Sequence, residues 1–180
     1  YTSLLGATNN NTVKSLAGEH VETEAALKAS GITYTILRNG WYTENYTASI
    51  PAALANNAFY GSAKNGKISS VLRAELAEAA VNVALSECHE NQTYELAGST
   101  SWTLADLAAE ISKQTGKDIP YVDIPAADYA AALVQAGLDE GFAGLIAQWD
   151  VDASNGALFS EDKTLDKLLG RPKAGLDVAV

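Results

Sequence analysis

Residues 32–46 of this chain read ITYTILRNGWYTENY, and this stretch decides the fold. Residues 32–37 are β-branched, aromatic or aliphatic, which is typical of a strand buried on both faces of a parallel sheet. The apolar run stops at Arg38, and Asn39-Gly40 directly after it is a turn signal. Because ligands bind at the carboxyl ends of parallel strands in open α/β sheets, we expect a functional site at this turn.

The segments around this strand predict alternating helices and strands. A helix is expected from Thr12, which can cap it, to about residue 30, where Gly31 supplies the stop. Residues 73–87 are rich in Ala, Leu and Glu and predict a second helix, and residues 92–97 predict another strand. This order of elements extends a parallel sheet.

The remaining segments are mostly helical, and Thr103 with Asp106 resembles a capping box at the start of one helix. Helices are expected over residues 43–57 with an interruption at Pro51, and over 103–115, 125–135, 139–149 and 163–169, with short strands at 59–61 and 121–124. A loop is expected at residues 152–156. We expect these helices to form a lobe that packs on the sheet.

Composition narrows the classes of partner. Twelve Lys+Arg against 22 Asp+Glu give a formal net charge of −10, so nucleic acid and anionic membrane surfaces are not expected as partners. Cys88 is the only cysteine, which excludes an intramolecular disulfide and a Cys/His zinc cage and favours a reducing, cytoplasmic setting. No run approaches the roughly 18 apolar residues of a membrane span. No metal site is expected.

Residues 37–45, LRNGWYTEN, carry a family resemblance together with the preceding GITYT. They resemble the NmrA-like branch of the atypical short-chain dehydrogenase/reductases, and within it the NADPH-dependent quinone oxidoreductases of type 2 and the triphenylmethane reductases. Further matching segments run through the whole chain, at residues 1–5, 19–24, 94–98 and 102–104. Their order and spacing make the resemblance specific.

The resemblance implies an α/β fold, the C-terminal part of a Rossmann-like parallel sheet with a mostly helical substrate lobe, in one NAD(P)-binding domain over residues 1–180. Proteins of this family start with a strand and a Gly-rich turn that cradles the cofactor pyrophosphate. Here no G-x-x-G-x-x-G occurs, and the chain contains no methionine, not even an initiator. We therefore expect a fragment without the nucleotide-binding half.

His20 is the candidate catalytic residue. Short-chain dehydrogenases usually carry Tyr-x-x-x-Lys on the helix before the central strand. Alignment on Glu24 places His20 at the lysine position and Leu16 at the tyrosine position, so the usual acid is absent. His20 could hold the nicotinamide ribose or relay a proton, with Glu24 orienting its second ring nitrogen. The alternative is a histidine packed between helix and sheet with Glu24 as partner.

Four further residues are candidates for NADPH binding. Ser3 stands at a strand end, where its hydroxyl could reach the carboxamide or the substrate, or could cap the polar loop. Asn39, Gly40 and Trp41 resemble the family's turn beside the nicotinamide, where glycine permits close backbone approach and tryptophan excludes solvent. Arg38 is expected to pair with a carboxylate rather than to catalyse.

Tyr42, Asn45 and Tyr46 are candidates for substrate binding. Their aromatic rings suit a flat quinone, and the amide could bind a carbonyl, although aromatic residues at helical spacing are also typical of a core. The implied activity is hydride transfer from NADPH to a quinone or similar flat electrophile. Two alternatives stay open: a dinucleotide-sensing regulator without turnover, and a fragment that is inactive by itself. An exposed sheet edge would make a homo-oligomer possible.

Overall fold

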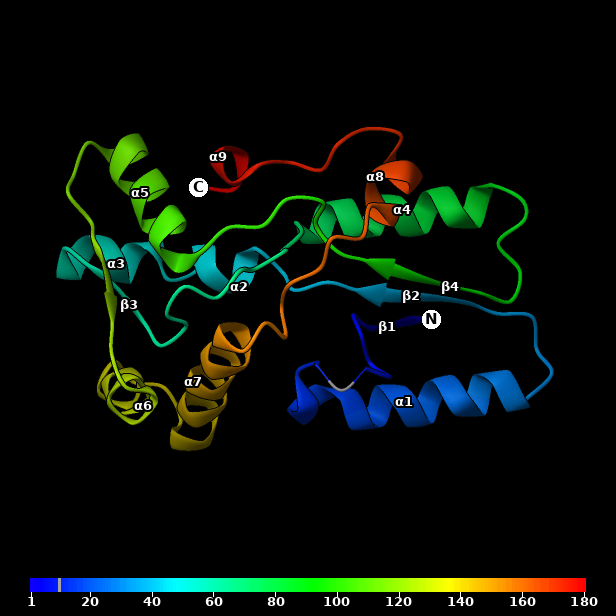
Figure 1. Cartoon of the computed structure of the whole chain (residues 1–180), viewed down its shortest axis with the longest axis horizontal. Helices are drawn as coiled ribbons and strands as arrows, with labels where there is room; N and C mark the ends of the chain where they lie inside the picture. The colour runs from blue at the N-terminus through cyan, green and yellow to red at the C-terminus, as the bar shows by residue number, and fades with distance from the viewer. Residues whose placement is uncertain (10) are drawn as a thin grey trace.

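The computed structural model describes residues 1–9 and 11–180, and a three-stranded parallel sheet lies at one end of the molecule (Figure 1). Its order is β1-β2-β4, with β2 (Thr35–Asn39) between β1 (Thr2–Leu4) and β4 (Gln92–Leu96). Helix α1 (Lys14–Ala29) lies on one side of this sheet, and α4 (Arg73–Leu85) and α8 (Thr164–Leu169) lie on the other. This arrangement confirms the predicted α/β class with parallel strands.

The layer between the sheet and α4 is apolar. Leu37 of β2 and Leu96 of β4 pack in one buried cluster with Leu76 and Ala79 of α4 and Leu165 of α8. Burial of side chains of this size contributes about 1.5–3 kcal/mol each, so this layer stabilises the packing of both strands on α4.

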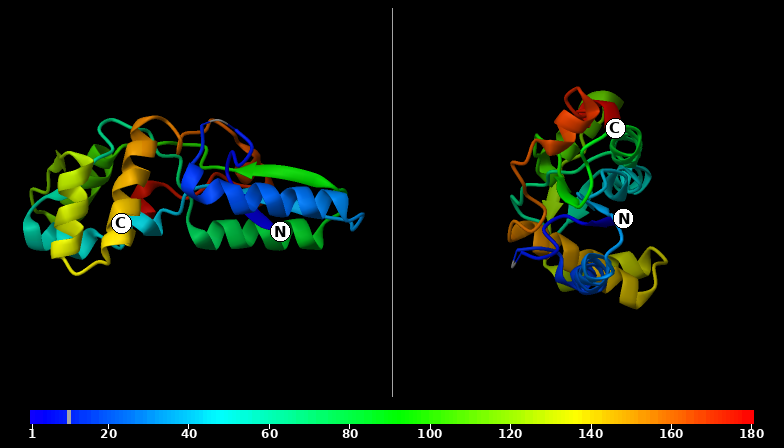
Figure 2. Two further views of the ribbon diagram at one scale, coloured as in Figure 1. Left: turned by 90° about the horizontal axis from the view of Figure 1, so that it is seen from below. Right: turned by 90° about the vertical axis from the view of Figure 1, so that its right-hand side faces the viewer.

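The second part of the molecule is mostly helical and lies beside the sheet along the long axis of the molecule (Figure 2). It contains a two-stranded parallel sheet of β3 (Phe59–Gly61) and β5 (Tyr121–Asp123). Its helices are α2 (Glu44–Thr47), α3 (Ile50–Asn56), α5 (Leu104–Thr115), α6 (Ala126–Gln135), α7 (Glu140–Ser154) and α9 (Leu176–Ala179). We call this part the helical lobe.

Several predicted boundaries are confirmed. The capping box at the start of α5 is present: Asp106 donates its backbone N–H to the Thr103 hydroxyl, and its carboxylate accepts from the Thr103 N–H. Gly116 ends α5 in the left-handed conformation that glycine favours. The expected break between α2 and α3 precedes Pro51, the second residue of α3.

The predicted central strand is wrong in its boundaries. Ile32 is 66% exposed and lies outside β2, whereas Arg38 and Asn39 belong to the strand. The backbone N–H of Gly40 then donates to Leu96 O at 2.8 Å, so the ladder continues where a turn was expected. Arg38 can lie in a buried strand because two carboxylates meet its guanidinium.

Two helix boundaries differ from the prediction. Thr12 does not cap α1, because its hydroxyl donates to Leu5 O at 3.1 Å and Val13 occupies the capping position. Helix α7 extends into the expected loop as far as Ser154, five residues beyond Trp149. Ala153 on this added turn is fully buried, and the packing of that face outweighs the polar composition of the segment.

Candidate functional site

A cavity of about 330 Å³ opens at the carboxyl ends of β1 and β2. It brings together seven of the residues singled out from the sequence: Ser3, His20, Asn39, Gly40, Trp41, Tyr42 and Asn45. We call it the strand-end cavity. Its position agrees with the expectation that ligands of a parallel α/β sheet bind where the strands end.

Asn39 lines this cavity, and one polar atom of its side chain lacks a partner. Its Oδ1 atom is buried, and no donor among residues 1–9 and 11–180 bonds to it. A buried acceptor without a donor costs about 1–3 kcal/mol. This acceptor therefore fits a ligand that offers an N–H group, such as the carboxamide of a nicotinamide.

Gly40 is required by the neighbouring strand rather than by a ligand alone. A Cβ atom at this position would lie 2.7 Å from Leu96 O and 3.2 Å from the Cα atom of Ala97. Both contacts are with backbone, which cannot move aside easily. The close backbone approach that the sequence suggested here is thus an approach of β2 to β4.

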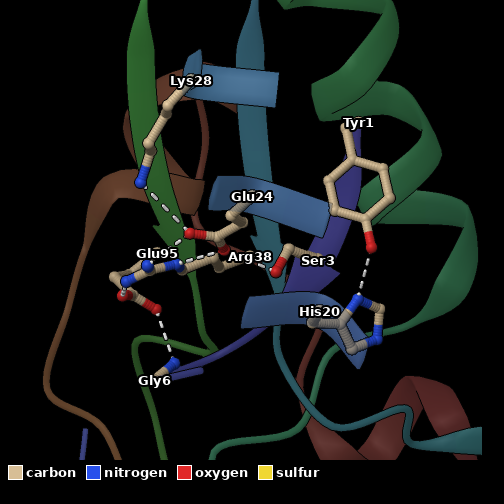
Figure 3. Close-up of polar contacts among 8 residues, drawn as sticks. All are labelled: Tyr1, Ser3, Gly6, His20, Glu24, Lys28, Arg38 and Glu95. Carbon is tan, nitrogen blue, oxygen red and sulfur yellow. Dashed lines mark hydrogen bonds and ion pairs between the residues drawn. The ribbon is translucent and has the colours of Figure 1, made fainter. Parts of the chain in front are cut away.

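His20 lines the strand-end cavity, but Glu24 does not orient it. The Nδ1 atom of His20 pairs with the Tyr1 hydroxyl at 2.8 Å, as Figure 3 shows. Glu24, one turn further along α1, is directed at the sheet instead. The expected His20–Glu24 pair is therefore wrong, both as a relay and as a packing arrangement.

Glu24 is the centre of a buried ionic network (Figure 3). Arg38 donates from Nε to Oε1 at 2.8 Å and from Nη2 to Oε2 at 2.7 Å, and Ser3 donates its hydroxyl to Oε1 at 2.6 Å. The third guanidinium nitrogen, Nη1, donates to Glu95 Oε1 at 2.8 Å. The expected pairing of Arg38 with a carboxylate is confirmed. The Ser3 hydroxyl donates its one hydrogen to Glu24, so toward a ligand it can only accept a hydrogen bond.

The network shifts the acidity of its members. Hydrogen bonds from Arg38, opposed in part by burial, lower the pKa of Glu24 from 4.5 to about 2. The pKa of Arg38 is raised by the bond to Glu24. Both groups are charged at any physiological pH, and the network is a fixed support under the carboxyl ends of β1 and β2.

A second cavity of about 560 Å³ adjoins the first and extends into the helical lobe. We call it the lobe cavity. Trp41, Asn45, Phe142 and Trp149 line both cavities, so the two share a mainly aromatic wall. Trp41 and Trp149 pack edge to face with ring centroids 5.3 Å apart. Tyr46, the remaining residue singled out from the sequence, lines the lobe cavity only.

Asp150 is a candidate that the sequence reading missed. It lines the lobe cavity, is 5% exposed, and accepts the Ser62 backbone N–H through Oδ2 at 2.8 Å. Burial raises its pKa from 3.8 to about 6. The available signal was the spacing of Ala143, Ala147 and Asp150, which places the carboxylate on the buried face of α7.

Residues 1–9 and 11–180 contain neither a metal-binding cluster nor a membrane-spanning helix. No group of three or more His, Cys, Asp or Glu side chains in this range could hold a metal ion. None of the described helices combines the length and the apolarity that a membrane crossing needs.

Comparison with known proteins identifies the family. No protein-family model matches the chain. Quinone oxidoreductase 2 of Escherichia coli (strain K12) is 52% identical over 180 residues, which are all of this chain and 62% of that protein. An uncharacterized protein of Haemophilus influenzae is 52% identical over 122 residues, which are 68% of this chain and 70% of that protein.

Solved structures indicate the same family. The NADPH complex of the E. coli quinone oxidoreductase superposes with a TM-score of 0.93 at 51% identity, over 99% of this chain and 62% of that one. The NADP(H) complex of Citrobacter sp. triphenylmethane reductase superposes with a TM-score of 0.94 at 32% identity, over 99% of this chain and 63% of that one. The chain thus spans about three-fifths of these relatives and corresponds to their C-terminal part. The chain belongs to the NmrA-like family of Rossmann-fold reductases that includes these two enzymes.

Proposed function

We propose that this chain is the C-terminal part of an NADPH-dependent oxidoreductase that transfers hydride to a quinone or a similar flat electrophile. One observation carries the proposal: two cavities meet at the carboxyl ends of the parallel strands and share an aromatic wall. A hydride donor in one cavity would lie next to an acceptor in the other. The names of the E. coli and Citrobacter relatives support this reading.

The strand-end cavity is the proposed nicotinamide site. Asn39 Oδ1 would accept an N–H of the carboxamide, and His20, Ser3, Gly40 and Trp41 would surround the ring and ribose. When bound there, NADPH would supply the hydride. Residues 1–180 contain no Gly-rich phosphate-binding turn, so most contacts to the rest of the nucleotide would come from a preceding N-terminal half of the same domain.

The lobe cavity is the proposed substrate site. Its walls are mostly apolar and aromatic, which suits a flat ring system. Asn45 reaches both cavities and could bind a substrate carbonyl, while Tyr46 packs edge to face on Trp102 and forms part of the wall. Tyr42 lies on the strand-end side, beneath the Arg73 guanidinium at 5.4 Å.

We also propose a compartment for the protein and an open sheet edge at which further strands could pair. The exposed, unpaired Cys88 favours a reducing, cytoplasmic compartment. Within the described residues β1 pairs with β2 alone, so its other edge is open to further strands or to a second copy of the chain.

The proposed function is tested with the complete product of the gene that encodes this chain, beside residues 1–180 alone. Fluorescence titration measures NADPH binding, and absorbance at the reduced-nicotinamide band measures quinone-dependent oxidation. We expect the complete product to bind NADPH and to oxidise it only when a quinone is present. NADPH binding without turnover on any quinone or dye would favour a dinucleotide-sensing regulator instead.

Asn39 offers a sharper test of the cofactor site. Asn39→Leu keeps the size of the side chain but removes the acceptor, so we expect the Kd for NADPH to rise about tenfold, equivalent to about 1.4 kcal/mol. Asn56→Leu at the exposed end of α3 is the matched control and should leave Kd unchanged. Equal affinities for the Asn39→Leu variant and the wild type would place the nicotinamide elsewhere.

A further inference from the structure

The carboxyl group of Asp150 is held at the wall of the lobe cavity by its contacts with residues 61 and 62. Ser62 donates its backbone N–H to Oδ2 at 2.8 Å. A Cβ atom at residue 61 would lie 2.8 Å from the same oxygen and 2.7 Å from Cδ1 of Leu104, so glycine at this position makes room for the carboxyl. Over the described residues Ser62 is the one hydrogen-bond donor to this carboxyl, so no donor bonds to Oδ1. That oxygen is free for a molecule in the cavity.

The surroundings of Asp150 favour its neutral, protonated form. Tyr46 of α2, Tyr121 and Asp123 of β5, and Tyr129 of α6 are the titratable groups that face it. Burial raises the pKa of each of the three tyrosines, which therefore stay neutral phenols. Asp123 adds negative charge. In the part of the chain that the structure describes, no Lys, Arg or His pairs with Asp150.

Glu44 is the other carboxylate on the lobe cavity, and its surroundings differ. Its Oε1 atom accepts the backbone N–H of Arg73 at 2.9 Å. Glu44 thus already serves the first turn of α4, where a negative charge is favoured by the helix dipole. For Asp150, the hydrogen bond from the Ser62 N–H favours the charged carboxylate, but burial outweighs this bond and raises the pKa from 3.8 to about 6.

Reduction of a quinone requires a proton as well as a hydride. Hydride transfer breaks the C4–H bond of the reduced nicotinamide and delivers two electrons and one hydrogen to the quinone, which leaves a hydroquinone monoanion. A proton on the remaining oxygen completes the neutral hydroquinone. The usual Tyr-x-x-x-Lys acid is absent from α1, where Leu16 and His20 occupy these positions.

We propose that Asp150 is the catalytic acid of this reductase: its carboxyl group binds the substrate carbonyl that projects into the helical lobe and gives it the proton. The inference rests on the proposed function. The two carbonyls of a 1,4-quinone stand at opposite ends of one ring, so one can face the strand-end cavity while the other faces Asp150. The carboxylate left after each turnover takes a new proton from solvent.

A comparison of two substrates isolates the proton step. A cationic triphenylmethane dye accepts hydride at its central carbon and becomes neutral without any proton, whereas a quinone needs one. Asp150→Asn retains the acceptor for the Ser62 N–H but has no proton to give. At pH 6, we expect this variant of the complete gene product to lose about a hundredfold in kcat for quinone. Its kcat for the dye should stay within about twofold of wild type.

The quinone probe and the control variant are chosen for this chain. Tetramethyl-1,4-benzoquinone is used because its methyl groups block addition of the exposed Cys88 thiol. Asp152→Asn is the matched control, since Asp152 lies on the same helix and accepts from the Gln148 amide at the surface at 2.9 Å. We expect this control to behave as wild type with both substrates. Dye turnover by Asp150→Asn also reports that this variant is folded.

A measurement without turnover gives a second readout. Infrared spectroscopy of the protein without NADPH should show a protonated carboxyl band that titrates near pH 6 and is missing from Asp150→Asn but present in Asp152→Asn. Addition of tetramethyl-1,4-benzoquinone should shift this band, because the carboxyl then donates to the quinone carbonyl.

The outcomes separate the inference from the proposed function. Wild-type protein that reduces neither quinone nor dye would refute the reductase proposal. Equal losses of kcat for both substrates in Asp150→Asn, or no loss for either, would overturn the role of Asp150 as acid while leaving the reductase intact. A carboxyl band that quinone does not shift would overturn the contact between Asp150 and substrate.

Discussion

Replacement of Glu24 by glutamine is expected to lower the free energy of unfolding by about 3–5 kcal/mol at pH 7. Glu24 is 1% exposed and receives two hydrogen bonds from Arg38, one from Ser3 and one from Lys28. The variant leaves the buried guanidinium with Glu95 as its only carboxylate partner among the described residues. Urea unfolding followed by circular dichroism measures the loss.

Two companion variants make this expectation specific. Glu22 lies in the same helix, and its side chain is exposed. Glu22→Gln should therefore change the free energy of unfolding by no more than about 0.5 kcal/mol. Glu24→Gln combined with Arg38→Met removes both charges, and the double variant should be more stable than the sum of the single losses indicates. A loss below about 1 kcal/mol in Glu24→Gln would contradict the account of the network.

The same pair makes stability depend on pH at the acidic end. The pKa of Glu24 is lowered from 4.5 in the unfolded chain to about 2 in the folded protein. Its contribution is therefore present above pH 4.5 and is lost as pH falls toward 2. A difference of this size corresponds to about 3 kcal/mol, which the Glu24→Gln variant should not lose on acidification.

Asp150→Asn is expected to stabilise the protein at pH 8, by up to about 3 kcal/mol. The folded pKa of Asp150 is raised from 3.8 to about 6, so the folded state prefers the protonated form. Its favourable contribution is complete below pH 3.8 and is lost as pH rises through 6. The asparagine variant carries no such charge, and it keeps an acceptor for the Ser62 N–H.

Unfolding free energies at pH 4 and pH 8 measure this effect. The difference between Asp150→Asn and wild type should be small at pH 4 and large at pH 8, whereas Asp152→Asn should show the same small difference at both. An Asp150→Asn variant that is no more stable than wild type at pH 8 would mean that the carboxylate is not held in an unfavourable environment. A stabilised variant that has lost quinone turnover is the expected combination for a functional residue in a strained setting.

The sequence predicts the elements of this protein better than their ends. Apolar runs predict the strands β2 and β4, and helical spacing predicts α4 and α5. These predictions hold because both patterns are local. The extension of β2 to Arg38 and Asn39 depends on Glu24 and Glu95, which are 14 and 57 positions away from Arg38. Local patterns contain no information on partners at such distances.

The residues of the candidate site also differ in whether a local sequence pattern indicates them. Residues near Asn39 could be proposed from the sequence because a strand end is a local feature, and they line one cavity. Asp150 was missed because its environment is made by Ser62, 88 positions away, and by side chains from several elements. His20 and Glu24 were read as a pair from their spacing, but on α1 one contacts Tyr1 and the other the sheet.

The most direct test of the central claim follows the hydride itself. NADPH carrying deuterium at both C4 positions is mixed with the complete gene product and a cationic triphenylmethane dye, and the colourless product is examined by mass spectrometry. The account predicts a product with one deuterium on its central carbon, formed more slowly by Asn39→Leu than by Asn56→Leu at subsaturating NADPH. A product without deuterium, or no product with either dye or quinone, would contradict direct hydride transfer at the strand ends.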